Sequence, residues 1–250
     1  SQVPEHAELH LLLSMIVPIA WLERVPTYKE QQQQIANRDL TNYGFLGYPV
    51  LQAADILIYR AERVPVGEDQ LAHLELCREI ARRFNSLYGE VFPEPQPLLS
   101  RTPRILGLDG KAKMSKSLGN HIALLDDEAA IQKKLQPAFT DPQRLRRTDP
   151  GRPEVCNIFT LHKAGPSPAE TVARIDRECR TAEIGCADCK KILGGNLAAL
   201  LAPIRRRAGS LAEQATAVRE TLDRGAQRCR AIAAQTMQEV RRRTGLRGQP

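Results

Sequence analysis

A short β-branched run, Val64-Pro65-Val66, is followed at once by Gly67 and then by Glu68-Asp69-Gln70. A glycine turn that joins a strand to a helix is the place where doubly wound α/β folds bind nucleotides. An acidic residue in such a turn can accept hydrogen bonds from ribose hydroxyls. The stretch therefore predicts an α/β nucleotide-binding layer, although the four residues of the turn are a weak signal when taken alone.

The segment before this turn, Tyr48–Tyr59, is an apolar stretch at helical spacing that contains one carboxylate, Asp55. Burying an unpaired carboxylate is costly, so Asp55 is expected to be buried beside a hydrogen-bond donor. A backbone N–H would give it a structural role. A donor that arrives with a bound ligand would make it a binding residue.

The pentapeptide Lys113-Met114-Ser115-Lys116-Ser117 lies between Gly107-Leu108-Asp109-Gly110 and Gly119. Glycines on both sides predict a mobile loop, which can present two ammonium groups and several hydroxyl or N–H donors to one anion. That equipment stabilises polyphosphate charge in a transition state. A solvated basic turn is the alternative. The five residues match the KMSKS signature of class I aminoacyl-tRNA synthetases, which favours the functional interpretation.

Four stretches together resemble the bacterial tryptophanyl-tRNA synthetases: Ser1–His6, Tyr48–Leu57, Val64–Gln70 and Lys113–Ser117. The sibling tyrosine enzymes typically have a glycine–tyrosine pair in place of Ala53-Ala54 and serine in place of Glu68, which disfavours tyrosine specificity. The resemblance implies an α/β fold. A Rossmann-like nucleotide-binding domain, incomplete at its start, is expected over residues 1–125, and an α-helical tRNA anticodon-binding domain over residues 126–250.

The resemblance also implies a role for each matching residue. Asp55 would accept the indole N–H of tryptophan, while Tyr48 and Gln70 would hold the substrate ammonium. Gly67, Glu68 and Asp69 would line the ATP ribose, and Ile105 would touch adenine together with Met114. The catalytic residues would be those that grip the departing pyrophosphate: Lys113, Ser115, Lys116 and Ser117.

The implied reaction joins tryptophan to ATP, with Mg²⁺, as tryptophanyl-adenylate and then passes the acyl group to tRNA(Trp). The family resemblance further implies a homodimer. A non-catalytic tRNA- or protein-binding fragment derived from such an enzyme is the alternative.

Class I synthetases also carry a His-x-Gly-His type motif after their first strand, and this sequence contains none. Its five histidines, none of them in that context, are His6, His10, His73, His121 and His162. The segment with this motif is expected to precede Ser1. On that expectation the chain carries half of an active site.

Four cysteines fall within 34 residues: Cys156, Cys179, Cys186 and Cys189, separated by 22, 6 and 2 residues. In a cytoplasmic chain metal ligation is favoured over disulfides, and either zinc or a 4Fe–4S cluster takes four thiolates. A capping box at Ser167–Glu170 predicts the helix that carries Cys179. The spacing resembles an iron–sulfur motif found in a subset of tryptophanyl-tRNA synthetases, which favours the cluster over zinc.

The net charge of +7 lies wholly in the last 50 residues, which contain eleven Arg, no Lys and four acidic residues. A basic tail on a neutral body indicates a polyanionic partner, RNA ahead of membrane, with a merely solubilising arginine-rich helix as the alternative. Ser210-x-x-Glu213 predicts the start of one long helix that ends at Arg241-Arg242-Arg243. No apolar run reaches the length of a membrane span and no signal peptide is visible, so the chain is predicted to be cytoplasmic.

Overall fold

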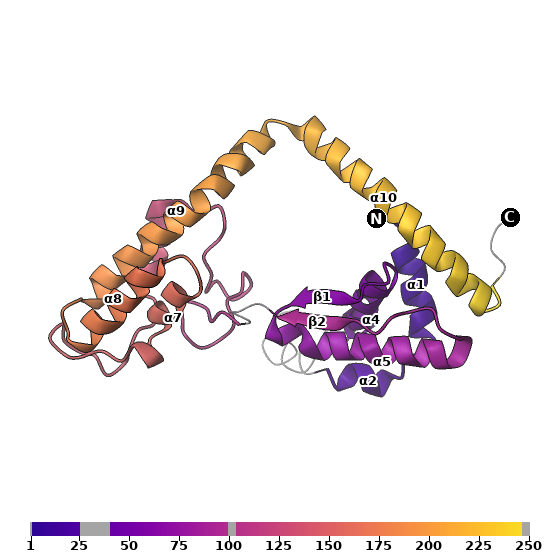
Figure 1. Ribbon diagram of the computed structural model, residues 1–250, viewed down its shortest axis with the longest axis horizontal. Coiled ribbons are helices and arrows are strands. Elements are labelled where there is room, and N and C mark those ends of the chain that lie inside the picture. Colours follow the sequence, from indigo (N-terminus) through magenta and orange to yellow (C-terminus); the bar gives the residue numbers. More distant parts are fainter. Residues whose placement is uncertain (1, 26–40, 100–103, 247–250) are drawn as a thin grey trace. The chain divides into compact units, whose positions relative to one another are not determined.

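The computed structural model describes residues 2–25, 41–99 and 104–246. These residues form two compact units, shown in Figure 1. The first combines Ser1–Pro103 with Arg219–Pro250, and the second is Arg104–Val218. The first unit is therefore assembled from both ends of the chain. Within the described ranges, none of the helices is both long enough and apolar enough to span a bilayer.

The first unit contains a parallel β-α-β arrangement. Strands β1 (Arg63–Val66) and β2 (Gln96–Leu99) pair in parallel, with Arg63 opposite Gln96 and Val66 opposite Leu99. Helix α5 (Leu71–Tyr88) makes the crossover between them. Between β1 and α5 lies the single 3₁₀ turn Glu68–Gln70, so the predicted order of strand, glycine turn and helix is confirmed.

Among the described residues, the further helices that belong wholly or partly to this unit are α1 (Glu5–Ser14), α2 (Ile19–Glu23), α4 (Tyr43–Leu57) and α10 (Ala215–Arg243). Their apolar faces share one core with α5. Leu9 and Leu13 of α1 are fully buried in it, as are Met237 and Val240 of α10. Burial of this apolar area is what holds the end of α10 against a unit that begins more than 200 residues earlier.

The second unit is mainly helical. Residues 104–120 form an irregular hairpin with an antiparallel bridge between Leu106 and Lys113. The helices that follow are α6 (Glu128–Leu135), α7 (Asn157–Lys163), α8 (Ala169–Arg180) and α9 (Cys186–Ala212), with a 3₁₀ turn at Pro153–Val155 before α7. Helix α6 packs on α9, and Ile131, Leu135, Ile158 and Leu193 form the centre of their core.

Two predicted capping boxes are wrong. Ser167 does not cap α8, because its hydroxyl bonds His162 Nδ1 at 2.6 Å and accepts from Asn196 Nδ2 at 2.8 Å, and the N-cap residue is Pro168. Ser210 lies inside α9, and the last helix begins only at Ala215. In both places a serine with an acid three residues later matches the capping pattern. Tertiary contacts of Ser167 decide the start of α8, and the continuation of α9 through Ser210 decides the start of α10.

Candidate active site

Helix α4 presents a polar stripe formed by Tyr48, Gln52 and Asp55. These residues are four and three positions apart, so they share one side of the helix. The side chain of Asn42 caps the helix by accepting the Phe45 N–H at 3.0 Å. The apolar side of α4, which includes Val50, Ala53, Ala54 and Leu57, is buried in the core. Packing of that side fixes the direction of the polar stripe.

Asp55 differs from its prediction in one respect. Its side chain is 52% exposed, so the expectation of a buried carboxylate is wrong. The expected donor is present, however: His6 Nδ1 lies 2.5 Å from Asp55 Oδ1. His6 Nε2 lies 2.6 Å from the Tyr59 hydroxyl. Because a carboxylate only accepts, His6 donates from Nδ1. The imidazole of α1 therefore orients the carboxylate of α4.

Tyr48 is held by His73, on the first turn of α5. The Tyr48 hydroxyl and His73 Nε2 are 2.7 Å apart. His73 is 3% exposed, and burial lowers the pKa of its imidazole, with the carboxylate of Asp69 acting in the opposite direction. Loss of hydration disfavours the charged form, so His73 is a neutral partner for the phenol near pH 7.

The turn after β1 places the other predicted residues of this unit beside the stripe. Gln52 Nε2 donates to Gln70 Oε1 at 3.2 Å, and Gln70 Nε2 donates to Asp69 Oδ2 at 2.8 Å. Gly67 has extended backbone and precedes Glu68, whose side chain is exposed. Gln70, predicted for tryptophan, and Asp69, predicted for ribose, are therefore hydrogen-bonded to each other and, through Gln52, to the α4 stripe.

The predicted adenine and pyrophosphate residues belong to the second unit. Met114 N donates to Ile105 O at 3.0 Å, which brings the two predicted adenine contacts together. Lys113 and Lys116 are exposed. The hydroxyls of Ser115 and Ser117 are 2.7 Å apart. The loop thus presents cations and hydroxyls on one short segment, which is suited to an anion.

Three of the four cysteines gather around one apolar group, and the four do not form a ready ligand set. Cys156, Cys179 and Cys189 pack against the small core of Phe159, Ile175 and Ile184. Burial, and then the nearby thiols of the other three cysteines, raise the pKa of Cys189 to about 12. Among the residues that the structure describes, no three His, Cys, Asp or Glu side chains stand where they could hold a metal ion.

Two of these thiols instead have other polar neighbours. Cys189 Sγ lies 3.5 Å from His162 Nε2, and Arg144 Nη1 lies 3.6 Å from Cys179 Sγ. Arg144 also donates through Nη2 to Ile184 O at 2.7 Å. Its guanidinium thus braces the cysteine-bearing segments from inside the unit.

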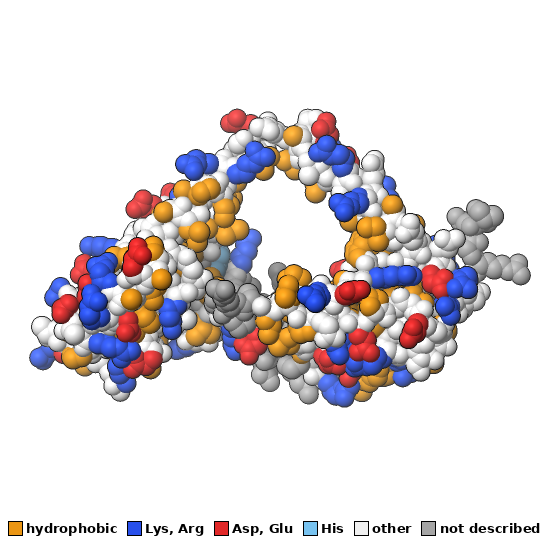
Figure 2. Space-filling model, in the orientation of Figure 1, with side chains coloured by type: hydrophobic (Ala, Val, Ile, Leu, Met, Phe, Trp, Pro, Cys, Tyr) orange, Lys and Arg blue, Asp and Glu red, His pale blue; other side chains and the backbone are white. Residues whose placement is uncertain are grey.

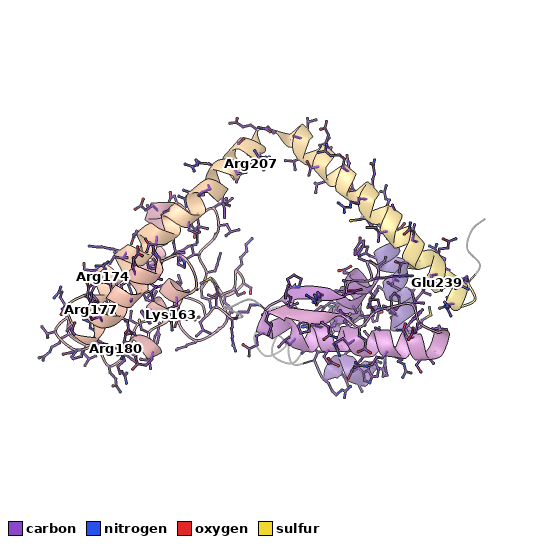
Figure 3. All side chains as sticks on the ribbon, in the orientation of Figure 1. Lys163, Arg174, Arg177, Arg180, Arg207 and Glu239 are labelled. Carbon is purple, nitrogen blue, oxygen red and sulfur yellow. The ribbon has the colours of Figure 1, made fainter. Side chains whose placement is uncertain are left out.

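Basic side chains gather on the helical part of the second unit. Arg174, Arg177 and Arg180 recur along α8, and Lys163 stands at the end of α7 (Figure 3). Figure 2 shows Lys and Arg side chains over α8 and along α9, interspersed with acidic ones. Arg174 pairs with Glu178, and Arg180 pairs with Asp176 and Glu154. All four basic side chains are exposed, which suits contact with phosphate.

The arginines that end the last helix make internal ion pairs. Arg241 bonds both carboxylate oxygens of Glu8 in α1. Arg242 and Arg243 pair with Glu239, labelled in Figure 3. Arg241 therefore helps to fasten α10 to α1, whereas the ion pairs of Arg242 and Arg243 lie within α10 itself. The charge count alone could not distinguish these structural uses from RNA binding.

Sequence reasoning missed four polar residues that hold the site together: His6, Gln52, His73 and Asn120. His6 and Gln52 lie within stretches that carry the family resemblance, and His73 and Asn120 each follow such a stretch by three residues. That position was the available signal. None has a motif of its own, because the contacts of each are to neighbouring protein groups: side chains for His6, Gln52 and His73, and also backbone for Asn120.

Known proteins similar to this chain agree with the geometry. The family described as tRNA synthetases class I (W and Y) matches residues 1–202. Tryptophan–tRNA ligase of Thermotoga maritima is 52% identical over 98% of this chain and 75% of its own length. The corresponding ligase of Deinococcus radiodurans is 48% identical over 98% of this chain and 74% of its own length.

The solved structures give the same result. The tryptophanyl-tRNA synthetase of Campylobacter jejuni, complexed with ADP and tryptophan, superimposes with a TM-score of 0.79 at 32% identity. The match covers 98% of this chain and 75% of that one. The predicted combination of a Rossmann-like α/β fold with a helical part is thereby confirmed. A strand–turn–helix beside the α4 stripe, a KMSKS loop and these likenesses lead to one assignment: the chain belongs to the bacterial tryptophanyl-tRNA synthetases of class I.

Proposed function

We propose that this chain is a tryptophan–tRNA ligase whose α4 stripe binds tryptophan and whose Lys113–Ser117 loop stabilises the departing pyrophosphate. The observation that carries the proposal is the His6–Asp55 contact at the end of that stripe. It fixes one carboxylate oxygen and directs the other outward from a half-exposed position. A carboxylate held in this way can accept an N–H from an aromatic ring.

The reaction needs little covalent chemistry from the protein. A carboxylate oxygen of tryptophan attacks the α-phosphorus of ATP, the bond from that phosphorus to its bridging oxygen breaks, and pyrophosphate leaves with the electron pair. A ribose hydroxyl of tRNA(Trp) then attacks the acyl carbon, and AMP leaves. Positioning and charge stabilisation supply the rate acceleration.

In this scheme Asp55 accepts the indole N–H, and Tyr48 and Gln70 hold the ammonium of tryptophan. The ATP ribose lies along the turn Gly67, Glu68 and Asp69. The Asp69 side chain is already linked to the stripe through Gln70. The adenine contacts are Ile105 and Met114, and the catalytic residues are Lys113, Ser115, Lys116 and Ser117. Mg²⁺ accompanies ATP as part of the substrate.

Asp55→Ala in the full-length protein tests the proposal. A charge-assisted hydrogen bond is worth roughly 1.5–3 kcal/mol, so tryptophan affinity should fall about ten- to a hundredfold while ATP affinity is retained. Titration calorimetry with each substrate separates the two. Asp176→Ala, on α8 of the second unit, is the matched loss of one carboxylate. Unchanged tryptophan affinity in Asp55→Ala would remove Asp55 from the site.

We assign residues 1–125 to amino-acid and nucleotide binding, and residues 126–250 to binding of the tRNA anticodon. The basic side chains of α7 and α8 support this assignment, because phosphate contacts contribute most of the sequence-independent affinity. The enzyme acts as a homodimer in the cytoplasm, where tRNA is charged for translation.

We further propose that Cys156, Cys179, Cys186 and Cys189 hold a 4Fe–4S cluster, with zinc as the alternative. The support is that four thiols from three segments lie near one another, since, in addition to burial, Cys156, Cys179 and Cys186 all help to raise the pKa of Cys189. Four thiolates are a soft donor set of the kind both centres use. The four thiols would come to metal-binding distances only when the metal binds, because metal binding and local folding are commonly coupled. The cluster would order the segment beside the anticodon-binding helices and take no part in the reaction.

Anaerobic purification tests the cluster. Brown protein with about four iron atoms per chain is expected. Cys186→Ser should lose the iron, while Cys229→Ser, in the other unit, should keep it. Stoichiometric zinc without iron would assign the site to structural zinc, and protein without metal would leave four ordinary thiols.

A further inference from the structure

Asn120 lies directly beneath the KMSKS loop, three residues after its end. Its side chain is 8% exposed and uses both ends of its carboxamide. Oδ1 accepts the Ser115 N–H at 2.8 Å, and Nδ2 donates to Lys113 O at 3.3 Å. Its backbone carbonyl accepts the Leu108 N–H at 2.8 Å. One buried amide therefore joins the start of the hairpin to the middle of the loop.

The surroundings of Asn120 are shaped to receive this amide. Nδ2 also donates to Asp109 Oδ2 at 3.0 Å. A Cβ atom on Gly107 would lie 2.0 Å from Nδ2, so only glycine leaves room for the amide there. Asn157 Nδ2 holds the Gly107 carbonyl at 2.7 Å. Hydrogen bonds from the Lys111 N–H and from Asn120 lower the pKa of Asp109, which is therefore ionised.

We propose that Asn120 is a positioning residue for adenylate formation: through Ser115, Lys113 and Asp109 it sets the loop conformation in which the two lysines meet the departing pyrophosphate. The inference rests on the proposed function of the loop. Lys113 and Lys116 lie three residues apart and repel each other, and glycines flank the loop, so the backbone needs an external constraint to hold both cations toward one anion. Asn120 provides that constraint from a buried position that no substrate has to touch.

Exchanging donor and acceptor tests this directly. Asn120→Asp replaces the donating Nδ2 by a carboxylate oxygen that faces the ionised Asp109 and the Lys113 carbonyl. We expect the rate constant of adenylate formation, followed by pyrophosphate exchange, to fall about ten- to a hundredfold with an unchanged KM for tryptophan. Combining it with Asp109→Asn should recover most of the loss, because an amide at position 109 can donate to the new carboxylate at position 120.

Two reference variants keep the outcomes apart. Lys116→Ala reports on the loop itself, and Lys111→Ala, an exposed lysine before the pentapeptide, is its control. If Lys116→Ala leaves adenylate formation unchanged, the proposed function of the loop is wrong. If Lys116→Ala lowers the rate but Asn120→Asp does not, only the present inference is overturned.

A purely structural role would give a different pattern. Thermal unfolding followed by circular dichroism reports whether the second unit, which contains Asn120, is folded in Asn120→Asp. An unfolded single variant that the Asp109→Asn exchange fails to restore would overturn the inference. Gly107→Ala, which displaces the amide sterically, should lower the rate as Asn120→Asp does, and Asp109→Asn should not rescue it; an unchanged rate in Gly107→Ala would count against the inference.

Discussion

At the scale of single residues, the side chains proposed to bind tryptophan are ordered by two histidines. His6 joins Asp55 to Tyr59, and His73 holds Tyr48. The orientations of the Asp55 carboxylate and the Tyr48 hydroxyl are thus set within the fold, before a substrate binds. Preorganisation of this kind reduces what substrate binding has to order.

The two nitrogens of His6 can be tested separately. The amide nitrogen of asparagine falls near the position of Nδ1, and that of glutamine falls near Nε2. His6→Asn should therefore retain the bond to Asp55, while His6→Gln should lose it and weaken tryptophan binding about two- to tenfold, the range for one hydrogen bond. Calorimetry with tryptophan and with an analogue methylated at the indole nitrogen measures this. Equal losses for both ligands would show that His6 does not act through the indole N–H.

His73 makes stability depend on pH. Its pKa is lowered in the fold by burial, whereas the unfolded chain titrates near the ordinary value of about 6.5. The unfolded state then binds a proton that the folded state does not. The free energy of unfolding is therefore unaffected by His73 titration above about pH 6.5, and it decreases as the pH falls from there toward the pKa of His73 in the folded state.

Melting temperatures measured between about pH 7.5 and 5.5 check this sign. His73→Gln keeps a nitrogen within reach of the Tyr48 hydroxyl and cannot titrate, so its melting temperature should fall less on acidification. His10, whose pKa burial also lowers, remains in the variant and leaves part of the slope. A slope identical to that of the parent protein would contradict the assignment.

The burial of Asp55 was predicted wrongly for a reason that lies in helix geometry. An apolar run with one carboxylate gives no orientation when hydrophobic residues flank it on both sides. In the structure Val50, Ala54 and Leu57 turn to the core, and Asp55 falls with Tyr48 and Gln52 on the opposite side. The expected hydrogen-bond donor to Asp55 is present because the need for it follows from the charge of the carboxylate. The exposure of Asp55 depends instead on which face of the helix packs on the core.

At the scale of elements, the short motifs predicted well where one local pattern decides the conformation. The strand β1 and its turn follow directly from sequence. The boundaries of α8 and α10 do not follow from sequence. Ser167 bonds residues of α7 and α9 in place of capping α8, and Ser210 lies inside α9. A cap is predictable only where nothing else competes for the serine.

The end of α5 gives an element-scale prediction. Gly89 has φ of 89°, and a Cβ there would lie 2.5 Å from Arg243 Nη1 at the end of α10. Gly89→Ala should destabilise the first unit by roughly 1–3 kcal/mol through backbone strain and displacement of the arginine. Gly225→Ala, inside α10 with open space around its Cβ, should instead stabilise by up to about 1 kcal/mol. Urea unfolding compares the two variants, and a loss shared equally by both would contradict the prediction.

At the scale of the whole molecule, the proposed tryptophan residues and the loop fall in different compact units. Sequence order alone could not show this division, because the first unit closes with residues after Arg219. The pattern of Ala233, Met237 and Val240 indicates an amphipathic helix, yet nothing in it names the apolar surface that it covers. Only the three-dimensional structure shows that α10 packs on the core formed by α1, α4 and α5.

The dependence of the first unit on α10 can be measured with the chain's single tryptophan. Trp21 packs against the same core and reports its unfolding by fluorescence. Met237→Ala, at a fully buried position, should cost roughly 2–5 kcal/mol and lower the temperature of the Trp21 transition. Met15→Ala removes the same side chain from a position that is 71% exposed and should leave that transition in place. Equal shifts in the two variants would show that α10 is not part of this core.

The two-ended first unit also sets an order of events during synthesis. Leu9 and Leu13 leave the ribosome early, but the residues of α10 that cover them follow only after all of Arg104–Val218 has been made. At ordinary elongation rates that interval is on the order of ten seconds, during which the nascent chain exposes part of its core. A message cut short before Ala233 would therefore yield a polypeptide that contains every side chain proposed to touch tryptophan and still lacks the surface that closes their unit.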